Sequence, residues 1–380
     1  MWTFTRKREC FNVSGSLKRR CVASAAPSIP LQYSERELDE IKHYDKVFAS
    51  AWVDHSTFVI GTKDNKLIRW DTDTGKHVNI PLPDSPQPRH RDRQDNCGIH
   101  SIAVSPSRTL LATGGSNPDD VAIFKLPSFD PVAILQSHEN WMFAAAWVGD
   151  SHLITGSRDS TVKLWSICSD EFLNQSPIVT RTDHDDKVRD LKYCLDTETV
   201  TTLSQDGTCK LWDPHEMLVV SSIRCPDPKE LVCMAVKSPL VAVGSQRFIT
   251  FIDMRCGHVV KSIASADEGW GVRSLSFQDN VVTCGGGKGR LSFLDTRTQK
   301  YIRIREINDS GCTGENHMDT ISYSTGTGHV VKDQVYAEHF AGQDIKHAVY
   351  THSQDFSRTS LLVAGGPLPY GLKGGYVGIW

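Results

Sequence analysis

A segment of about 40 to 45 residues recurs along this sequence, and it constrains the fold more than any other feature. Each copy has an alternating apolar stretch, a stretch of small residues, a tight turn and a strand that ends in an aromatic residue. Repeats of this length with four short strands are typical of β-propeller blades. Seven copies predict an all-β, seven-bladed β-propeller. The closing aromatics are Trp70, Phe124, Trp165, Trp212, Phe251, Phe293 and Trp380.

Two of the repeats carry the polar pattern of WD repeats. Asp159 and Asp206 each stand six residues before a closing Trp, and His138 and His184 stand upstream of them. Buried His, Asp and Trp side chains need hydrogen-bond partners, and within one blade they can supply them to each other. We therefore expect these residues to tie the blades together, and we assign them no chemical role.

The two ends of the chain indicate how the ring closes. Trp380 ends a third strand, so the fourth strand of the last blade must come from upstream of Lys46, and residues 36–41 (RELDEI) are the candidate. A strand supplied in this way removes the open sheet edges. The sequence predicts an N-terminal strand that closes the ring.

Two segments fall outside the repeats. Residues 1–34 carry six Lys and Arg against one acid, and we expect a basic, flexible N-terminal tail there. Residues 35–380 form the propeller. The last step between closing aromatics spans two periods, and we expect an insertion at about 303–343, rich in Gly, Ser, Thr, Asp and His.

Composition and motifs exclude several classes of protein. The chain has no run of 18 apolar residues, no apolar segment typical of a secretory signal and no C-x-x-C pair among its 11 Cys. We expect reduced thiols in a cytoplasmic and nuclear protein without a metal or other cofactor. The Gly-rich run at 285–290 precedes a strand and lacks the Ser or Thr of a phosphate loop. No catalytic motif is present, so we expect a protein that is not an enzyme.

Aligning the blades places cations at two positions that face one mouth of the central channel. These positions are the start of the innermost strand and the turn between the second and third strands. The cations are Lys46, Lys63, His100, Arg158, Lys187, Arg189, Arg247, Arg273 and Lys288. No acid stands beside Arg273 in the sequence. Residues 35–380 carry 36 basic and 44 acidic side chains, a net −8, so a basic mouth would be a local feature.

Two readings of the basic mouth remain open. Surface Lys and Arg can cluster by chance. Alternatively, the mouth is an anion pocket in which Arg158, Arg189 and Arg273 hold carboxylates and Lys46, Lys63 and Lys187 add charge. A channel mouth admits a chain end but not a duplex, so we expect a bound C-terminus rather than nucleic acid.

Two neighbouring blades share a further pattern at the end of their third strands. Residues 251–255 and 293–297 both read aromatic-apolar-Asp-x-Arg, with Asp253 followed by Arg255 and Asp295 by Arg297. A local Asp–Arg pair of this kind contributes little to stability when it is exposed. The pattern could also mark a contact with a partner protein.

These tandem endings resemble the W-D-x-R boxes of WD-repeat substrate receptors of cullin-4 RING ubiquitin ligases. Within that class the chain is similar to the family of DDB- and cullin-4-associated factor twelve, over roughly residues 35–380. The matching segments are 46–50 (KVFAS), 97–100 (CGIH), 106–115 (PSRTLLATGG), 156–159 (GSRD) and 363–369 (VAGGPLP). The family has a longer N-terminal extension that grips the adaptor, and residues 1–34 show no helical apolar period that matches it.

The resemblance implies a substrate receptor that binds acidic C-terminal degrons, notably twin-Glu ends. Its pocket cations correspond to Lys46, Lys63, Arg158, Lys187, Arg189 and Arg273. Its adaptor contact corresponds to Arg297, with Arg255 in the parallel position, each preceded by its Asp, Asp295 and Asp253. The implied partners are the ligase adaptor (the large subunit of damage-specific DNA-binding protein), cullin-4 and a RING protein through it, and substrates with acidic C-termini, with no membrane and no direct nucleic acid.

Three rival functions remain open from the residues. A ligase-independent WD-repeat scaffold would bind through its rim without needing a free carboxylate. A reader of phosphorylated or nucleic-acid anions would show a steep salt dependence and indifference to the end of a peptide. An enzyme is the weakest of the three, because the scan finds no pairing of a nucleophile with a base.

Overall fold

The computed structural model describes residues 20–21, 35–38, 40, 43–85, 97–167, 176–267, 269–305 and 318–380. Most of the predicted basic tail and the middle of the predicted insertion therefore lie outside the described residues. None of the helices in the described part of the chain is long and apolar enough to cross a membrane.

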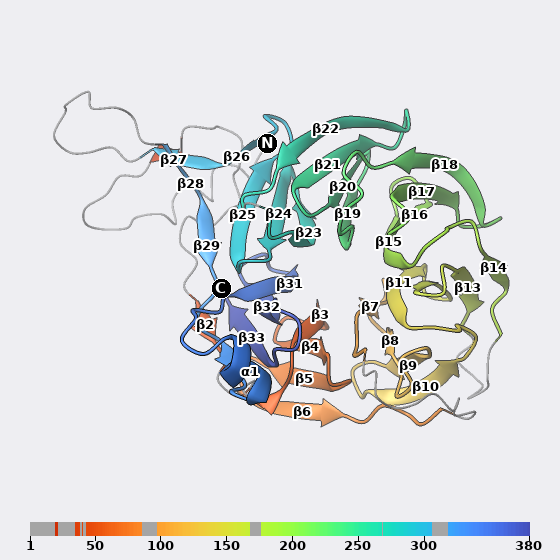
Figure 1. Cartoon of the computed structure of the whole chain (residues 1–380). Coiled ribbons are helices and arrows are strands. Elements are labelled where there is room, and N and C mark those ends of the chain that lie inside the picture. The colour runs from red at the N-terminus through yellow and green to blue at the C-terminus, as the bar shows by residue number, and fades with distance from the viewer. Residues whose placement is uncertain are drawn as a thin grey trace, which may run out of the picture.

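Seven antiparallel sheets stand around a central channel, which confirms the predicted seven-bladed β-propeller (Figure 1). The first three blades each have four strands. Blade one is β3 (Val47–Trp52), β4 (Thr57–Thr62), β5 (Leu67–Asp71) and β6 (His77–Ile80). Blade two is β7 (Ile102–Val104), β8 (Leu110–Gly114), β9 (Val121–Lys125) and β10 (Asp130–Leu135). Blade three is β11 (Met142–Val148), β12 (His152–Ser157), β13 (Val162–Ser166) and β14 (Val179–Arg181).

The remaining blades follow the same order from the channel outward. Blade four is β15 (Val188–Cys194), β16 (Thr199–Ser204), β17 (Thr208–Asp213) and β18 (Leu218–Arg224). Blade five is β19 (Cys233–Lys237), β20 (Leu240–Gly244), β21 (Phe248–Asp253) and β22 (His258–Ala264). Blade six begins with β23 (Val272–Gln278), β24 (Val281–Gly286) and β25 (Arg290–Asp295), and blade seven with β31 (His347–Gln354), β32 (Leu361–Pro367) and β33 (Gly374–Ile379).

An N-terminal strand closes the ring, as the sequence predicted. Strand β2 (Arg36–Glu37) pairs antiparallel with β33, with Arg36 opposite Ile379. The Leu38 N–H donates to the Val377 carbonyl at 2.9 Å and its side chain is buried, so the attachment runs one residue past the strand. The first and last parts of the chain thus share one sheet, which leaves no gap between blades seven and one.

The predicted ties within the blades are present. In blade three, the His138 ring contacts Asp159 at 3.0 Å and Thr155 at 2.7 Å, and the Trp165 indole N–H donates to the same Thr hydroxyl at 2.9 Å. Blade four repeats the arrangement with its own His, Asp, Thr and Trp. These buried polar groups are satisfied within their blade, which confirms that they have a structural role.

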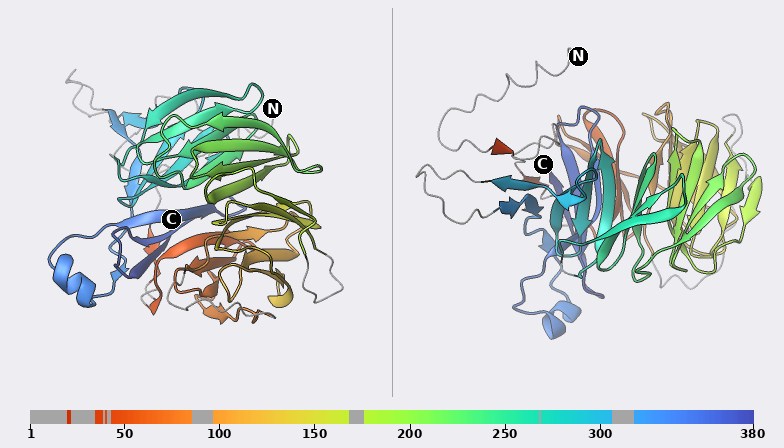
Figure 2. Two further views of the ribbon diagram at one scale, coloured as in Figure 1. Left: turned by 45° about the vertical axis from the view of Figure 1, so that its right-hand side comes forward. Right: turned by 90° about the horizontal axis from the view of Figure 1, so that it is seen from above.

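The segment predicted as an insertion leaves blade six and returns to it. After β26 (Lys300–Tyr301) the chain forms β27 (Arg303–Arg305) and β28 (Met318–Thr320), which pair in a separate sheet with β1 (Arg20–Cys21). It then returns as β29 (Ser322–Ser324), which pairs with β25. Strand β30 (His329–Val330) pairs with β33, and the short helix α1 (Gln334–His339) follows. Figure 2 shows α1 and the β27–β28 hairpin projecting from the ring.

Candidate functional site

A repeated β-bulge directs one side chain per blade into the channel. In five innermost strands the pairing with the second strand shifts by one residue, and a bulge of this kind leaves one residue unpaired and re-aims its side chain. The unpaired residues are Phe48, Phe143, Arg189, Arg273 and Tyr350. All five line one cavity of about 370 Å³ in the channel. His100 and Val232 line it from the other two blades, so all seven blades contribute.

Aromatic rings cover the half of this cavity that belongs to blades seven, one, two and three. Tyr350 meets Phe48 edge-on at 5.2 Å, Phe48 stacks on His100 at 4.5 Å, and His100 meets Phe143 edge-on at 4.9 Å between ring centroids. Burial and the charge of Arg189 lower the pKa of His100 to about 3, so this imidazole is neutral at pH 7. We call these four rings the aromatic arc. No pattern in the sequence predicts this arc, although His100 was expected to face the channel.

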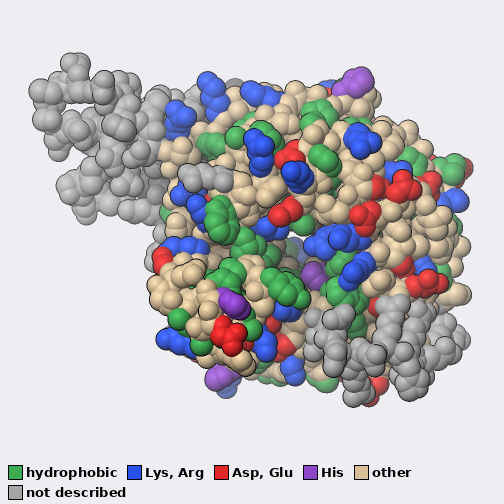
Figure 3. All heavy atoms as spheres, viewed as in Figure 1, with side chains coloured by type: hydrophobic (Ala, Val, Ile, Leu, Met, Phe, Trp, Pro, Cys, Tyr) green, Lys and Arg blue, Asp and Glu red, His purple; other side chains and the backbone are tan. Residues whose placement is uncertain are grey.

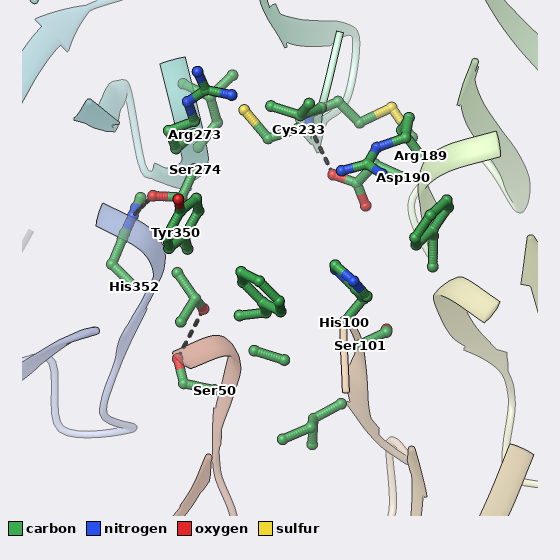
Figure 4. Close-up of a pocket in the computed structure, with 18 of the residues that line it drawn as sticks. Ser50, His100, Ser101, Arg189, Asp190, Cys233, Arg273, Ser274, Tyr350 and His352 are labelled. Atoms are coloured by element: carbon green, nitrogen blue, oxygen red, sulfur yellow. Dashed lines mark hydrogen bonds between the residues drawn. The ribbon is translucent and has the colours of Figure 1, made fainter. Parts of the chain in front are cut away.

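Two guanidinium groups line the other half of the cavity, together with Asp190 and Lys192, whose side chains form an ion pair at 3.1 Å (Figure 4). The Arg189 guanidinium lies 4.3 Å from the Phe143 ring centroid, and no ion pair joins it to the described residues. Its Nε is buried without a hydrogen-bond partner in the described part of the chain. Burial is the largest cause of the lowered pKa of Arg189, and the charges of Arg273 and Arg158 lower it further. The charges of Cys97 and Asp190 oppose this lowering of the pKa, so Arg189 lies among both cations and acidic groups.

Arg273 has an acidic neighbour that is distant in the sequence. The Arg273 Nη2 atom donates to Glu230 Oε2 at 2.6 Å and to the Trp270 carbonyl at 3.3 Å, while its Nε is buried without a partner among the described residues. Glu230 belongs to the neighbouring blade, 43 positions earlier, so no local sequence pattern could reveal it. The guanidinium is thus partly neutralised but keeps one unused donor.

The structure places Lys46 and Lys63 together at the start of blade one. The Lys63 N–H donates to the Lys46 carbonyl at 2.8 Å, so the turn of the blade rests on the beginning of its first strand. The Lys46 ammonium is buried and donates to the Pro369 carbonyl at 3.2 Å. Lys63 is one-third exposed, and its ammonium lies 3.7 Å from Asp45. Burial and the charge of Lys63 lower the pKa of Lys46 to about 8, against an opposing effect of Asp45.

Arg158 and Lys187 lie on the same face of the ring. The Arg158 N–H donates to the Trp141 carbonyl at 2.8 Å, and its exposed guanidinium lies 4.5 Å from the centroid of that indole. The Lys187 carbonyl accepts from the Gln205 N–H at 3.0 Å in the corresponding turn of blade four. We call this face, formed by the strand starts and the second-to-third turns, the rim. On the face turned toward the viewer in Figure 3, Lys and Arg side chains border the central hollow.

The six predicted pocket cations therefore fall into two groups. Arg189 and Arg273 line the cavity, and Lys46, Lys63, Arg158 and Lys187 lie at the rim above it. The other two cations of the turns also lie on the rim, where each is near an aromatic ring: Arg247 is 5.4 Å from Phe248, and Lys288 is 5.4 Å from Trp270. Their role in binding stays a prediction.

A Ser–His contact in the cavity does not form a catalytic pair. His352 lies between the Ser274 hydroxyl at 2.8 Å and the Ser276 hydroxyl at 2.7 Å. The Ser274 hydroxyl donates its proton to the Val349 carbonyl at 3.0 Å, so it can only accept from the imidazole. The ring cannot act as a base toward that serine in this arrangement, and both of its nitrogens are bonded to hydroxyls rather than a carboxylate. The contact joins blades six and seven.

The two aromatic-apolar-Asp-x-Arg endings lie on the face opposite the rim. Strands β21 and β25 start at rim turns and end at Asp253 and Asp295. Arg255 donates to Asp253 through Nε at 3.1 Å and Nη2 at 2.7 Å, with its side chain three-quarters exposed. Arg297 makes a looser pair with Asp295, with 3.4 Å between Nε and Oδ1, and is about half exposed. Each Asp thus holds an Arg at the surface of this second face.

Comparisons with known proteins agree with the fold and the motifs. A family model described as the DDB1- and CUL4-associated factor 12 beta propeller matches residues 29–184 and 173–380. The "Ribosome biogenesis protein WDR12 homolog" of Trichoplax adhaerens is 27% identical over 157 residues, which cover 38% of this chain and 32% of that protein. The chain thus matches about a third of the length of that relative.

A solved structure titled "Structure of U3-55K" matches with a TM-score of 0.65 and 14% identity, covering 91% of this chain and 98% of that chain. At this level of identity the likeness supports the propeller fold alone.

Proposed function

The chain belongs to the DDB1- and CUL4-associated factor 12 β-propeller family, and we propose that it is the substrate-recognition subunit of a cullin-4 RING E3 ubiquitin ligase. In this role it binds a substrate at the rim and the ligase adaptor at the opposite face. The ubiquitin transfer itself belongs to the other ligase subunits, so the chain is a non-catalytic receptor. We place it in the cytoplasm and nucleus, where its buried Cys side chains would stay reduced.

The proposed substrate feature is an acidic C-terminus, in particular one that ends in two Glu residues. The observation that carries this proposal is the pair Arg189 and Arg273, which line one channel cavity on a chain of net negative charge. Guanidinium groups suit planar carboxylates, which they can bind through two parallel hydrogen bonds. The rim cations Lys63, Arg158 and Lys187 add attraction for the second and third carboxylates of such an end.

The channel geometry favours a chain end over an internal segment. The cavity is lined by residues of all seven blades, so a peptide reaches it along the channel. A terminal carboxylate can reach Arg189 inside the channel, whereas a continuous chain would have to fold back on itself. Capture of a terminal carboxylate is a known mode of peptide recognition.

The proposed adaptor contact uses Arg255 and Arg297 on the second face. Both Arg side chains are held by a neighbouring Asp at the end of a third strand, and both are largely exposed. Because the rim and this face lie at opposite ends of the blades, the chain can bind a substrate and the adaptor at the same time.

A peptide-binding measurement tests the substrate half of the proposal. We would measure the affinity of a labelled ten-residue peptide ending in Glu-Glu and of the same peptide with an amidated C-terminus. The free acid should bind more tightly, because amidation removes one charge-assisted hydrogen-bonding group worth about 1.5–3 kcal/mol, or roughly 10- to 150-fold. Equal binding of both peptides would identify a general anion site and refute a C-terminal pocket.

Variants in one blade separate the pocket from the rest of the surface. Arg189→Met removes a guanidinium group from the cavity and should lower the affinity for the free-acid peptide by at least tenfold. Arg224→Met removes an exposed cation from the outer strand of the same blade and should leave affinity unchanged. Charge reversal by Arg273→Glu or Arg158→Glu should abolish binding while the chain stays folded.

A ligase-independent scaffold is the second candidate, since one relative is a WD protein named for ribosome biogenesis. A scaffold of that kind would bind partners through its rim without regard to a free carboxylate. Failure of both peptides to bind would favour this candidate.

A further inference from the structure

Large hydrophobic side chains are exposed on one part of the rim, beside the cavity. Trp270, in the loop before β23, is 47% exposed, and Tyr370, in the turn between β32 and β33, is fully exposed. Leu368 lies in the same turn as Tyr370 and is half-buried. We call Trp270, Leu368 and Tyr370 the apolar shelf. A group of exposed apolar side chains next to a polar pocket is typical of an interaction surface.

The shelf is bonded to the proposed pocket through Arg273. The guanidinium that enters the cavity donates to the Trp270 carbonyl at 3.3 Å. Gly271, between the two residues, has φ +87°, and a Cβ at this position would lie 2.9 Å from the Arg273 Nη2 atom. The positive φ favours glycine, and a side chain here would displace the Arg273 guanidinium. The position of the Trp270 loop is therefore fixed relative to the guanidinium.

The two halves of the shelf meet at the turn of blade six. A Cβ placed on Gly287 would contact both the Trp270 carbonyl and the Leu368 Cδ2 atom, the latter at 3.1 Å. The Lys288 ammonium lies 5.4 Å from the Trp270 ring centroid, and Lys46 donates to the Pro369 carbonyl beneath Tyr370. The shelf is thus apolar with cations at its edge. Figure 3 shows hydrophobic side chains beside the central hollow.

Among the described residues, the rim over blades three and four is charged rather than apolar. Near blades three and four, Arg158 and Lys187 stand among the exposed acids Glu139, Asp185 and Asp186. A peptide held at Arg189 and Arg273 by its acidic end therefore meets mixed charges over these blades and apolar surface over blades six and seven. A large apolar side chain upstream of that end is favoured over blades six and seven.

We propose that the apolar shelf binds an aromatic or large aliphatic side chain that precedes the acidic C-terminus of the substrate by two to four residues. The inference rests on the proposed function, because the acidic end positions the peptide. An extended chain advances about 3.3 Å per residue, so two to four residues span roughly 7–13 Å. The Arg273 guanidinium contacts the Trp270 carbonyl, so the Trp270 indole lies within this span of the guanidinium.

Four peptides and two variants test the inference. The ten-residue peptides end in Glu-Glu, carry either Phe or Ser three residues before the last Glu, and have a free or an amidated C-terminus. For the whole chain we expect Phe to improve affinity about tenfold over Ser when the C-terminus is free. Trp270→Ala should remove this advantage, and Leu195→Ala, which truncates a 76% exposed side chain on the opposite face, should leave it intact.

The outcomes distinguish the shelf from the pocket. Equal affinity of the free-acid Phe and Ser peptides, with amidation still weakening both, would overturn the shelf and leave the proposed function standing. No effect of amidation would refute the proposed function itself. An equal loss of affinity for both peptides in Trp270→Ala would mean that the residue only positions Arg273, which would also overturn the shelf. Binding of the Phe peptide with either terminus would make the shelf a general hydrophobic site.

Discussion

The buried ammonium of Lys46 makes a specific prediction about stability. Its charge lies beside Lys63 and beneath the turn that carries Pro369, with one hydrogen bond to that carbonyl at 3.2 Å. Such a group favours the neutral form, because burial removes water from the charge and a second cation repels it. We predict that Lys46→Met stabilises the chain at pH 7, even though it removes a hydrogen bond.

The magnitude follows from the pKa. Burial and Lys63 lower the pKa of Lys46 from 10.5 to about 8, and a difference of this size corresponds to about 3 kcal/mol. Between pH 8 and 10.5 the unfolded chain holds this proton and the folded chain does not, so folding stability rises with pH across that window. Below pH 8 both states hold it, and the full destabilisation is present. The lost hydrogen bond offsets about 1 kcal/mol of the gain in the variant.

Urea unfolding at pH 7, 8, 9 and 10 measures this effect. At pH 7 the free energy of unfolding of Lys46→Met should be about 2 kcal/mol higher than that of the unmodified chain. This difference should shrink toward pH 10. Lys261→Met, which replaces an exposed Lys on β22, is the control and should follow the unmodified chain at every pH. A variant that is less stable at pH 7, or a difference that does not depend on pH, would refute the reasoning.

Three further predictions follow from the described contacts. The Arg297→Ala variant should no longer co-purify with the ligase adaptor, while its affinity for the peptide should be unchanged. If the variant still co-purifies with the adaptor, the motif has no role in adaptor binding. Thr202→Val removes the hydroxyl to which the buried His and Trp of blade four are both hydrogen-bonded. The free energy of unfolding in urea should fall by about 1–3 kcal/mol. An unchanged unfolding midpoint would show that these hydrogen bonds do not stabilise the blade. Burial raises the pKa of the Cys225 thiol to about 12. Iodoacetamide at pH 8 should therefore modify the exposed Cys256 before Cys225, as followed by mass spectrometry. Modification of Cys225 as early as that of Cys256 would contradict its burial.

The blades and their ties were predictable because they depend on local, repeated pattern. The closing aromatics fix the number of blades, and the spacing of Asp159 and Trp165 fixes a hydrogen-bonded group within one sheet. Ring closure by β2 followed from counting strands, since the last blade was one strand short. Each of these inferences uses residues of one blade, or a count of elements, and needs no knowledge of how blades pack.

The interior of the channel was harder to predict. A bulge moves a side chain to the other face of its strand, and Phe48, Phe143 and Tyr350 reach the channel only through such a shift. Contacts between distant segments were also beyond the sequence. Glu230 reaches Arg273 from the neighbouring blade, and Lys46 bonds to a turn 323 residues away.

The division of the cavity into aromatic and cationic halves determines how a peptide end can lie in it. The same bulge gives five of the blades an equivalent inward position, and His100 and Val232 line the cavity from the other two. Carboxylates are favoured beside Arg189 and Arg273, and the aromatic arc opposite them is neutral, while the one acid of the cavity, Asp190, is paired with Lys192. An acidic end therefore enters with its carboxylates toward blades four and six, and the Glu230 bond to Arg273 holds that guanidinium in place before a ligand arrives. A carboxylate that displaces Glu230 exchanges one ion pair for another, whereas one that binds Arg189 gains a new pair. Arg189 should consequently contribute more to affinity than Arg273.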